Sequence, residues 1–317
     1  MANVFTSIAT AGGWQTNTVK GAWDLVFSRA LNAYPICRQF VDKRPERPTH
    51  RGDSVTLQLT NYFSEAAITA AKTPLTDEVD VDSIQLPATS TVVLTPNEYG
   101  GAVTRTLKLA NRSMVAVDPV IALDLADMAA KVIDELLQDQ MILGSQVYYG
   151  GTATSTATVA AGNTITSAMI RKGVTKLRAN QAQTRDGLYY AGVIHPNVSF
   201  DLRSESGSGG WRVPQEYLAS EGRLYRGEIG EWEGARFIEN ARTRKANDGA
   251  TGTTVYRSYL LGREALAEAV VQEPEVRVSP QVDKLYRNQS VGWYADLAFK
   301  IFRDQALVRF ESATAAS

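Results

Sequence analysis

The stretch Asp118-Pro-Val-Ile-Ala-Leu-Asp-Leu-Ala-Asp-Met-Ala-Ala-Lys-Val-Ile-Asp-Glu-Leu-Leu-Gln-Asp-Gln-Met-Ile-Leu143 decides the fold. Its apolar residues recur at near-helical spacing, and neither glycine nor proline interrupts it between Pro119 and Gly144. Asp118 suits the N-cap, Pro119 the first helical position and Gly144 the end of the helix. The pattern predicts one helix over 118–143, about 25 residues or roughly 38 Å long. The mean helix of globular proteins has only about 11 residues.

Two stretches of alternating polarity precede this helix. Apolar residues share one face of each stretch: Val55, Leu57, Leu59 and Phe63 in 53–63, and Ile84, Leu86, Ala88, Val92 and Leu94 in 84–94. We predict a long hairpin of two strands of about 11 residues, each roughly 36 Å long, with 64–83 at its tip. Such a hairpin is marginally stable alone, and we expect no cover for it within the chain. Tyr99-Gly-Gly101 is expected to break the chain before a short strand over 102–109.

Helices and strands alternate after the long helix. Thr166 is expected to cap a second helix, and the apolar run 189–195 predicts a buried strand that ends at Pro196. Residues 263–270 fit one or two helical turns, and strict alternation over 291–301 predicts a further strand. The sequence therefore predicts an α+β protein.

The charges are balanced overall but separated along the chain. There are 33 Lys and Arg against 34 Asp and Glu, so a general nucleic-acid binder is excluded. Basic residues gather in an N-terminal arm and acidic residues at the hairpin tip: Lys43, Arg44, Arg47 and Arg51, and Asp77, Glu78, Asp80 and Asp82. We expect neither segment to be covered by its own chain, and the arm of one copy to meet the hairpin of the next. A nucleic-acid contact for the basic stretch and a hard-cation site at the acidic tip remain alternatives.

Residue patterns that carry catalysis or metal binding are scarce. The sequence has no phosphate-binding P-loop, no His-Glu-x-x-His pair and no Gly-x-Ser-x-Gly elbow. His195 could act as a general base near Ser199 or Asp201, although an inert histidine at a strand end is the preferred interpretation. Glu228, Glu231 and Glu233 form a possible carboxylate cluster on glycine-rich turns. We expect no enzyme activity, no cofactor and no metal site.

The order of elements resembles the major capsid proteins of tailed bacteriophages with the Hong Kong 97-type fold, and most nearly the phage N-four-like major capsid family. The resemblance rests on the helix above and on five shorter stretches: Pro74-Leu-Thr76, Asn97-Glu-Tyr-Gly-Gly101, Gly192-Val-Ile-His-Pro-Asn197, Gly227-Glu-Ile-Gly-Glu-Trp-Glu-Gly-Ala-Arg-Phe-Ile238 and Asp296-Leu-Ala-Phe-Lys-Ile-Phe-Arg-Asp-Gln-Ala-Leu-Val-Arg-Phe310.

The resemblance implies a shell subunit built from four parts. These are an N-terminal arm (1–51), an extended-loop hairpin (52–100), a peripheral domain with the long spine helix (101–145 and 270–300) and an axial domain (146–269 and 301–317). Copies would form hexamers and pentamers of an icosahedral head around double-stranded DNA, assembled in the host cytoplasm. The partners implied are other copies, packaged DNA, a portal, and possible scaffold and decoration proteins, with no membrane.

Three alternatives remain open at this point. An encapsulin-type nanocompartment shell would share the fold but enclose protein cargo. A cytoplasmic α/β enzyme would need catalytic motifs that the sequence lacks. A tail-tube subunit would form stacked rings, for which so long a helix is unusual. We also expect deletion of residues 1–45 to abolish particles while the remainder stays folded.

Overall fold

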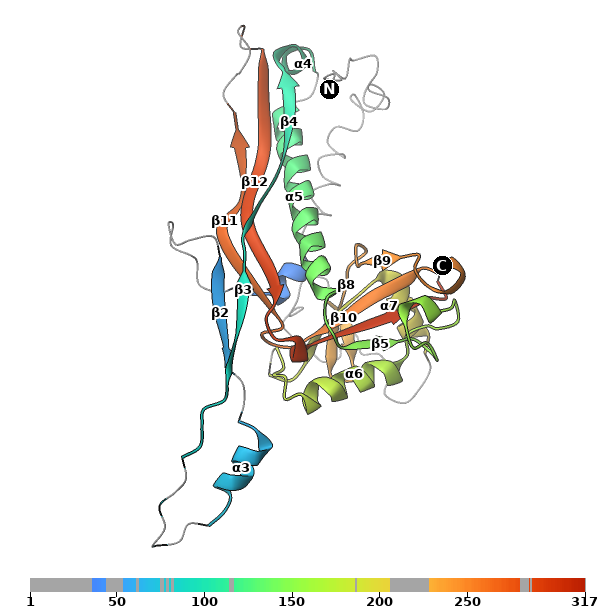
Figure 1. The fold of residues 1–317 in the computed structure, drawn as a ribbon. Coiled ribbons are helices and arrows are strands. Elements are labelled where there is room, and N and C mark those ends of the chain that lie inside the picture. Colours follow the sequence, from blue (N-terminus) through green and yellow to red (C-terminus); the bar gives the residue numbers. More distant parts are fainter. Residues whose placement is uncertain are drawn as a thin grey trace, which may run out of the picture.

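The computed structural model describes residues 36–43, 54–60, 63–74, 77, 80, 83–113, 117–185, 187–205, 228–279, 285 and 287–316. These residues form an elongated unit, a compact unit beside its lower end, and a hairpin that extends away from both (Figure 1). None of the described helices is long and apolar enough to cross a membrane.

The elongated unit is a four-stranded sheet with one helix along it. The strand order is β1 (Asp42–Lys43), β11 (Leu266–Val278), β12 (Asn288–Ile301) and β4 (Asn97–Thr106). Helix α5 (Val117–Met141) lies against this sheet over its length (Figure 1). Alternate residues of β12 are buried in the core that also holds the inner face of α5: Val291, Trp293, Ala295 and Leu297 from the strand, and Leu125, Ala129, Ile133 and Leu137 from the helix. The apolar face of the strand, with a period of 2, therefore packs in the same core as the apolar face of the helix, with a period of 3.6.

The long predicted helix is confirmed, with changes at both ends. The described helix begins at Val117, so Asp118 lies inside its first turn and is not the N-cap. Pro119 is tolerated there because the first N–H groups of a helix have no partner within it. The helix ends at Met141, and Gly144 is buried where an added Cβ would lie 2.7 Å from Cδ2 of Leu307. Close packing therefore accounts for this glycine.

The predicted break at Gly100-Gly101 is wrong, because both glycines lie inside β4. They are paired with Tyr294 and Trp293 of β12. A Cβ on Gly100 would lie 2.8 Å from the backbone oxygen of Trp293, and one on Gly101 would lie 2.5 Å from Cε of Met128 on α5. The glycines thus allow a close approach of neighbouring backbone and helix. The chain then forms α4 (Leu107–Arg112), where a strand to residue 109 was expected.

Gly100→Ala is expected to destabilise the fold by about 1–3 kcal/mol, because the new methyl group meets a backbone oxygen that cannot rotate away. Gly101→Ala should cost less, since the Met128 side chain that it meets is flexible. Urea unfolding of both variants checks the order. Gly162→Ala is the control, because nothing lies within 4 Å of its added Cβ. Equal stability of Gly100→Ala and the wild type would contradict the packing argument.

The compact unit is a mixed sheet flanked by two helices. Its strand order is β5 (Val147–Tyr149), β13 (Leu307–Ser312), β10 (Val255–Leu261), β6 (Tyr190–Ile194), β8 (Ala235–Glu239) and β7 (Glu228–Trp232), with β9 (Lys245–Ala246) also on β10. The helices are α6 (Ser167–Ala179) and α7 (Pro196–Ser204), and three short 3-10 turns complete the unit: η2 (Thr156–Thr158), η3 (Ala250–Gly252) and η4 (Asp304–Ala306). The predicted Thr166 cap is confirmed, because its side chain accepts the N–H of Met169.

The hairpin is shorter and better covered at its base than predicted. Strands β2 (Val55–Thr60) and β3 (Thr89–Leu94) have six residues each, paired from Val55 with Leu94 to Thr60 with Thr89. The apolar faces of both strands pack on the sheet of the elongated unit, in one cluster: Val55, Leu57, Leu59, Val92, Leu94, Ala267, Ala269, Ala298 and Phe302. Helix α3 (Glu65–Ala71) follows β2, where the sequence predicted no helix. Residues 266–278 form one strand, so the helical turns expected over 263–270 are wrong.

Part of the arm is also covered by the chain itself. The 3-10 turn η1 (Cys37–Phe40) packs against α5, and Cys37, Phe40 and Val41 are buried. Arg38 reaches the fully buried Glu268 at 2.7 Å. The expectation of an arm without intramolecular cover is therefore wrong for 36–43. A deletion that spares the fold has to stop before Ile36, not at residue 45.

Candidate assembly surface

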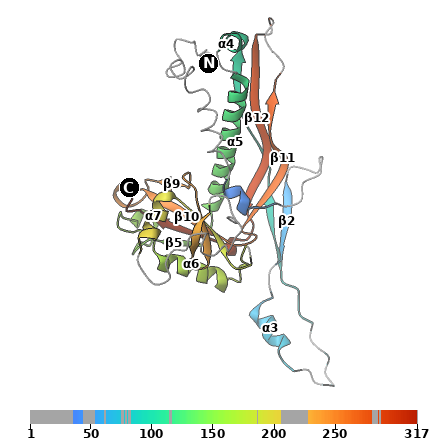
Figure 2. The same cartoon turned by 180° about the vertical axis from the view of Figure 1, so that it is seen from behind.

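The far part of the hairpin exposes apolar side chains. Beyond the paired strands, Phe63, Ile68, Ile84 and Leu86 are all exposed, and Leu86 is 85% exposed. Both views place α3 and its flanking segments away from the two units (Figures 1 and 2). Exposed large apolar side chains on one projecting segment are typical of protein contacts. The alternation of 53–63 and 84–94 found Phe63, Ile84 and Leu86, but it placed them in strands rather than beyond them.

The predicted charged sites are only partly described. Lys43 lies on β1, where its register partner is Glu268. Asp77 and Asp80 are exposed and lie in the connection between α3 and β3. Arg44, Arg47, Arg51, Glu78 and Asp82 lie outside the described residues. The described members therefore belong to different parts of the chain, and their pairing between copies stays a prediction.

Two carboxylates lie opposite one another on neighbouring strands of the elongated unit, and the sequence did not predict this pair. Asp296 on β12 is the register partner of Glu98 on β4, and Oδ1 of Asp296 is buried without a hydrogen-bond partner. Gln272 of β11 stands on its other side, and Arg277 lies over the nearby Tyr294 ring at 4.0 Å. Burial, and next the Glu98 carboxylate, raise the pKa of Asp296 above its usual value.

Asp296→Asn is therefore expected to raise the thermal unfolding midpoint at pH 7. A carboxyl group with a raised folded-state pKa carries a penalty when it is ionised, and asparagine removes the charge. The penalty disappears as the pH falls through the folded and then the unfolded pKa of Asp296, so the advantage of the variant should vanish near pH 4 or below. Calorimetry at both pH values checks this, with the exposed Asp77→Asn as control. A variant less stable than wild type at pH 7 would contradict it.

His195 has a structural role. It caps α7, because its Nδ1 accepts the N–H of Asn197 at 3.1 Å, and its ring contacts Tyr256. Burial, and next Lys245, lower its pKa, which favours the neutral ring that such an acceptor needs. The Ser199 hydroxyl donates to Pro196 O and to Glu239, and Asp201 accepts the N–H of Ala315. The side chains of His195, Ser199 and Asp201, the candidates for a catalytic pair, are thus each engaged in other contacts.

The other candidate chemical groups are also held in structural contacts. Glu228 is fully buried near Arg236, and Glu231 is the register partner of that arginine. Glu233 instead pairs with Arg171 at 2.6 Å, so the three glutamates do not share one partner. Burial, and next Asp134, raise the pKa of the Cys37 thiol, which keeps it protonated. Among the described residues no group of three or more His, Cys, Asp or Glu is placed to hold a metal.

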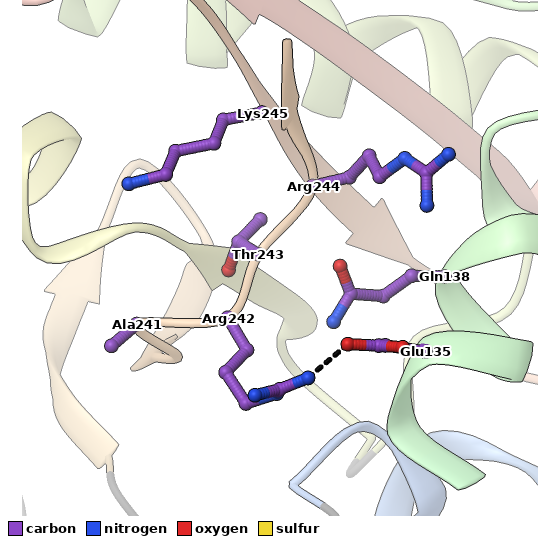
Figure 3. Close-up of a pocket in the computed structure, with 7 residues that line it drawn as sticks. All are labelled: Glu135, Gln138, Ala241, Arg242, Thr243, Arg244 and Lys245. Atoms are coloured by element: carbon purple, nitrogen blue, oxygen red, sulfur yellow. Dashed lines mark hydrogen bonds and ion pairs between the residues drawn. The ribbon is translucent and has the colours of Figure 1, made fainter. Parts of the chain in front are cut away.

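One pocket of about 300 Å³ lies between α5 and the turn after β8 (Figure 3). It is lined by Glu135, Gln138, Ala241, Arg242, Thr243, Arg244 and Lys245. Arg242 points across it to Glu135, with which it forms an ion pair (Figure 3). Its wall therefore belongs to both units.

This architecture is similar to that of known phage capsid proteins. Residues 144–296 match a family model described as phage capsid protein. The capsid of Ralstonia phage GP4 is similar in structure, with a TM-score of 0.73 and 16% identity, over 87% of each chain. The chain has the Hong Kong 97-type capsid fold. The capsid of cyanophage Pam1 is also similar in structure (TM-score 0.65, 15% identity, 88% of this chain and 89% of that one). Bacteriophage PhiM1 is a third neighbour (TM-score 0.62, 12% identity, 89% and 87%).

The capsid fold confirms the predicted α+β class and the resemblance to tailed-phage capsid proteins. The family match and the capsid fold together support the predicted function, a major capsid protein. The narrower likeness to the phage N-four-like family stays a prediction. No curated protein sequence matches the chain.

Proposed function

We propose that this chain is the structural subunit of a tailed-phage head, self-assembling into hexamers and pentamers of an icosahedral shell in the virion. The carrying observation is the hairpin: its far part extends away from the two units (Figure 1), and Phe63, Ile68, Ile84 and Leu86 on it are exposed. Apolar surface of this kind is stabilised when a partner covers it, and a second copy is the partner that a shell supplies.

The proposed role is structural. The described residues that catalysis would need are committed to caps, ion pairs and the core, and the capsid fold is consistent with a protein that has no enzyme activity. We further propose double-stranded DNA as the content of the shell, a portal and optional scaffold and decoration proteins as partners, and the host cytoplasm as the place of assembly.

We propose the four-part division with boundaries adjusted to the observed strands. The peripheral domain would begin at Asn97 and again at Leu266, because β4 and β11 start there and share one sheet. The compact unit would be the axial domain, and residues 54–94 would carry the extended loop.

Negative-stain microscopy of the purified chain tests the proposed function. Closed particles of uniform size that protect DNA from nuclease support it. Uniform particles filled with protein instead would favour the nanocompartment alternative, and a small discrete oligomer at all concentrations would overturn the shell proposal.

The pairing of the basic arm of one copy with the acidic tip of the next is a separate proposal. Reversing Asp77, Glu78, Asp80 and Asp82 to Lys should lower particle yield at about 50 mM salt by tenfold or so, and less at high salt, because exposed charges are screened beyond about 10 Å at 0.1 M. Light scattering of assembly at both salt concentrations checks it. Reversal of Glu65, which is exposed as Asp77 and Asp80 are, is the control. Unchanged yield at low salt would refute the charge pairing.

A further inference from the structure

Helix α6 of the compact unit has a strongly basic exposed surface. Its inner side is apolar and buried in the core, with Met169, Ile170, Val174 and Leu177. The charged residues of the helix are all cationic and all exposed: Arg171, Lys172, Lys176 and Arg178. We call the surface that these four side chains form the α6 face. In both views the helix lies along the lower edge of the compact unit (Figures 1 and 2).

Most of this positive charge is not neutralised by the described part of the chain. Arg171 pairs with Glu233 at 2.6 Å. Lys172, Lys176 and Arg178 form no ion pair with any residue that the structure describes. The helix dipole favours cations in the last turn, which accounts for Lys176 and Arg178 but not for Lys172 in the second turn. The α6 face therefore carries cations that the fold itself does not require.

The long helix of the elongated unit has the opposite charge. Helix α5 contains six acidic residues and one basic residue, Lys131. Because exposed charges of one sign create a field over the surface around them, a polyanion is repelled by α5 and attracted to α6. The α6 face is thus the side of the chain on which a polyanion would lie.

The chemistry of the α6 face suits a phosphate backbone better than a protein. The centre of a protein interface is formed by apolar and aromatic side chains, and no large apolar side chain of α6 is exposed. Phosphate oxygens need only cations and hydrogen-bond donors. Thr175 adds an exposed hydroxyl within one turn of Lys172. The surface offers the contacts that phosphates take and lacks the ones that a protein takes.

We propose that the α6 face contacts the phosphate backbone of double-stranded DNA without reading its sequence. The inference rests on the proposed function, in which DNA fills the shell, and it assigns α6 to the side of the chain that faces the content. The contact of one copy is weak, because affinity grows with the number of phosphates that are neutralised. Weak binding is consistent with the balanced charge of the chain, and many copies in one shell act on the same DNA together.

Fluorescence anisotropy of a dye-labelled duplex of about 30 bp tests this inference. The full chain is used, with the unassembled fraction isolated by size-exclusion chromatography. Lys172→Gln with Lys176→Gln removes two cations and keeps a good helix former at both positions. Affinity at about 20 mM salt should fall at least about tenfold. The slope of log affinity against log salt should become shallower by about 1.8, since each phosphate contact contributes about 0.9. The thermal unfolding midpoint should not change.

A matched variant separates the α6 face from net charge. Lys108→Gln with Arg112→Gln removes two exposed cations from α4 and should leave the affinity and the slope unchanged. An equal loss in both variants, or an unchanged affinity of the α6 variant, would overturn the inference. Displacement of the duplex by polyglutamate of equal total charge, at equal concentration, would also overturn it, because an acidic protein would then be the partner.

The outcome is independent of the microscopy that tests the shell, because duplex binding needs no particles. Particles together with an α6 variant that binds DNA normally would refute the α6 contact alone. A small oligomer that binds DNA through α6 would refute the shell alone.

Discussion

Replacing residues 61–88 by an Asn-Gly turn abolishes particle formation and leaves the rest of the chain folded. Thr60 and Thr89 are register partners at the end of the β2–β3 pair, so a two-residue turn closes the hairpin there. The deletion removes the exposed Phe63, Ile68, Ile84 and Leu86, and it leaves the buried cluster at the hairpin base intact. The surface that a neighbouring copy would cover is lost, whereas the core is not.

Size-exclusion chromatography and microscopy measure particles, and urea unfolding measures the fold. We expect particle yield to fall at least about a hundredfold, since a lattice needs the same contact at every subunit. Leu86→Ser in the full-length hairpin is the matched variant, expected to weaken assembly less. Normal particles from the shortened chain would show that the hairpin is not the assembly element and would remove the observation that carries the proposed function.

Phe40→Ala destabilises the whole chain by about 3–5 kcal/mol, the usual cost of removing a fully buried phenylalanine ring. Phe40 has no exposed surface, it belongs to the main core, and the Arg185 guanidinium lies 5.7 Å from its ring centroid. The arm segment that the sequence assigned to intermolecular contact is therefore part of the chain's own core.

Urea unfolding followed by tryptophan fluorescence measures this loss. Ile68→Ala is the control, because Ile68 lies on α3 with half of its surface exposed and should change stability by less than about 0.5 kcal/mol. If Phe40→Ala proves as stable as Ile68→Ala, residues 36–43 contribute nothing to the monomer, and the original expectation of an uncovered arm holds for them as well.

The elements with a strong local period were predictable from the sequence. The long helix, the capped helix at Thr166 and the strand over 291–301 are all present, and Met169, Ile170, Val174 and Leu177 are buried as their spacing indicates. Local signals failed where a long-range contact overrides them. Two adjacent glycines usually indicate a turn, but Gly100 and Gly101 instead permit a strand to lie close to Trp293 and Met128.

The candidate assembly surface was predictable only in outline. Alternating polarity located the hairpin, yet alternation does not reveal where pairing stops, so the lengths of β2 and β3 were overestimated. The contacts between α5 and the turn after β8 could not be predicted from the sequence, because Asp134, Glu135 and Asp139 fit the polar side of a helix. Nothing near them in sequence indicates Asn240, Arg242 and Arg244 as their partners.

The sequence by itself determined the α+β class, the order of arm, hairpin, long helix and later sheet, and the separation of basic and acidic segments. Each of these follows from periodicity or composition within a few tens of residues. Tertiary structure alone decided that Cys37, Phe40 and Val41 are buried, and that the hairpin base is covered while its far part is not. It also decided that three acidic residues of α5 contact the turn after β8. The reason is distance along the chain. The contacts of Asp134 with Cys37 and Asn240 span 97 and 106 residues, and only the folded chain brings such groups together.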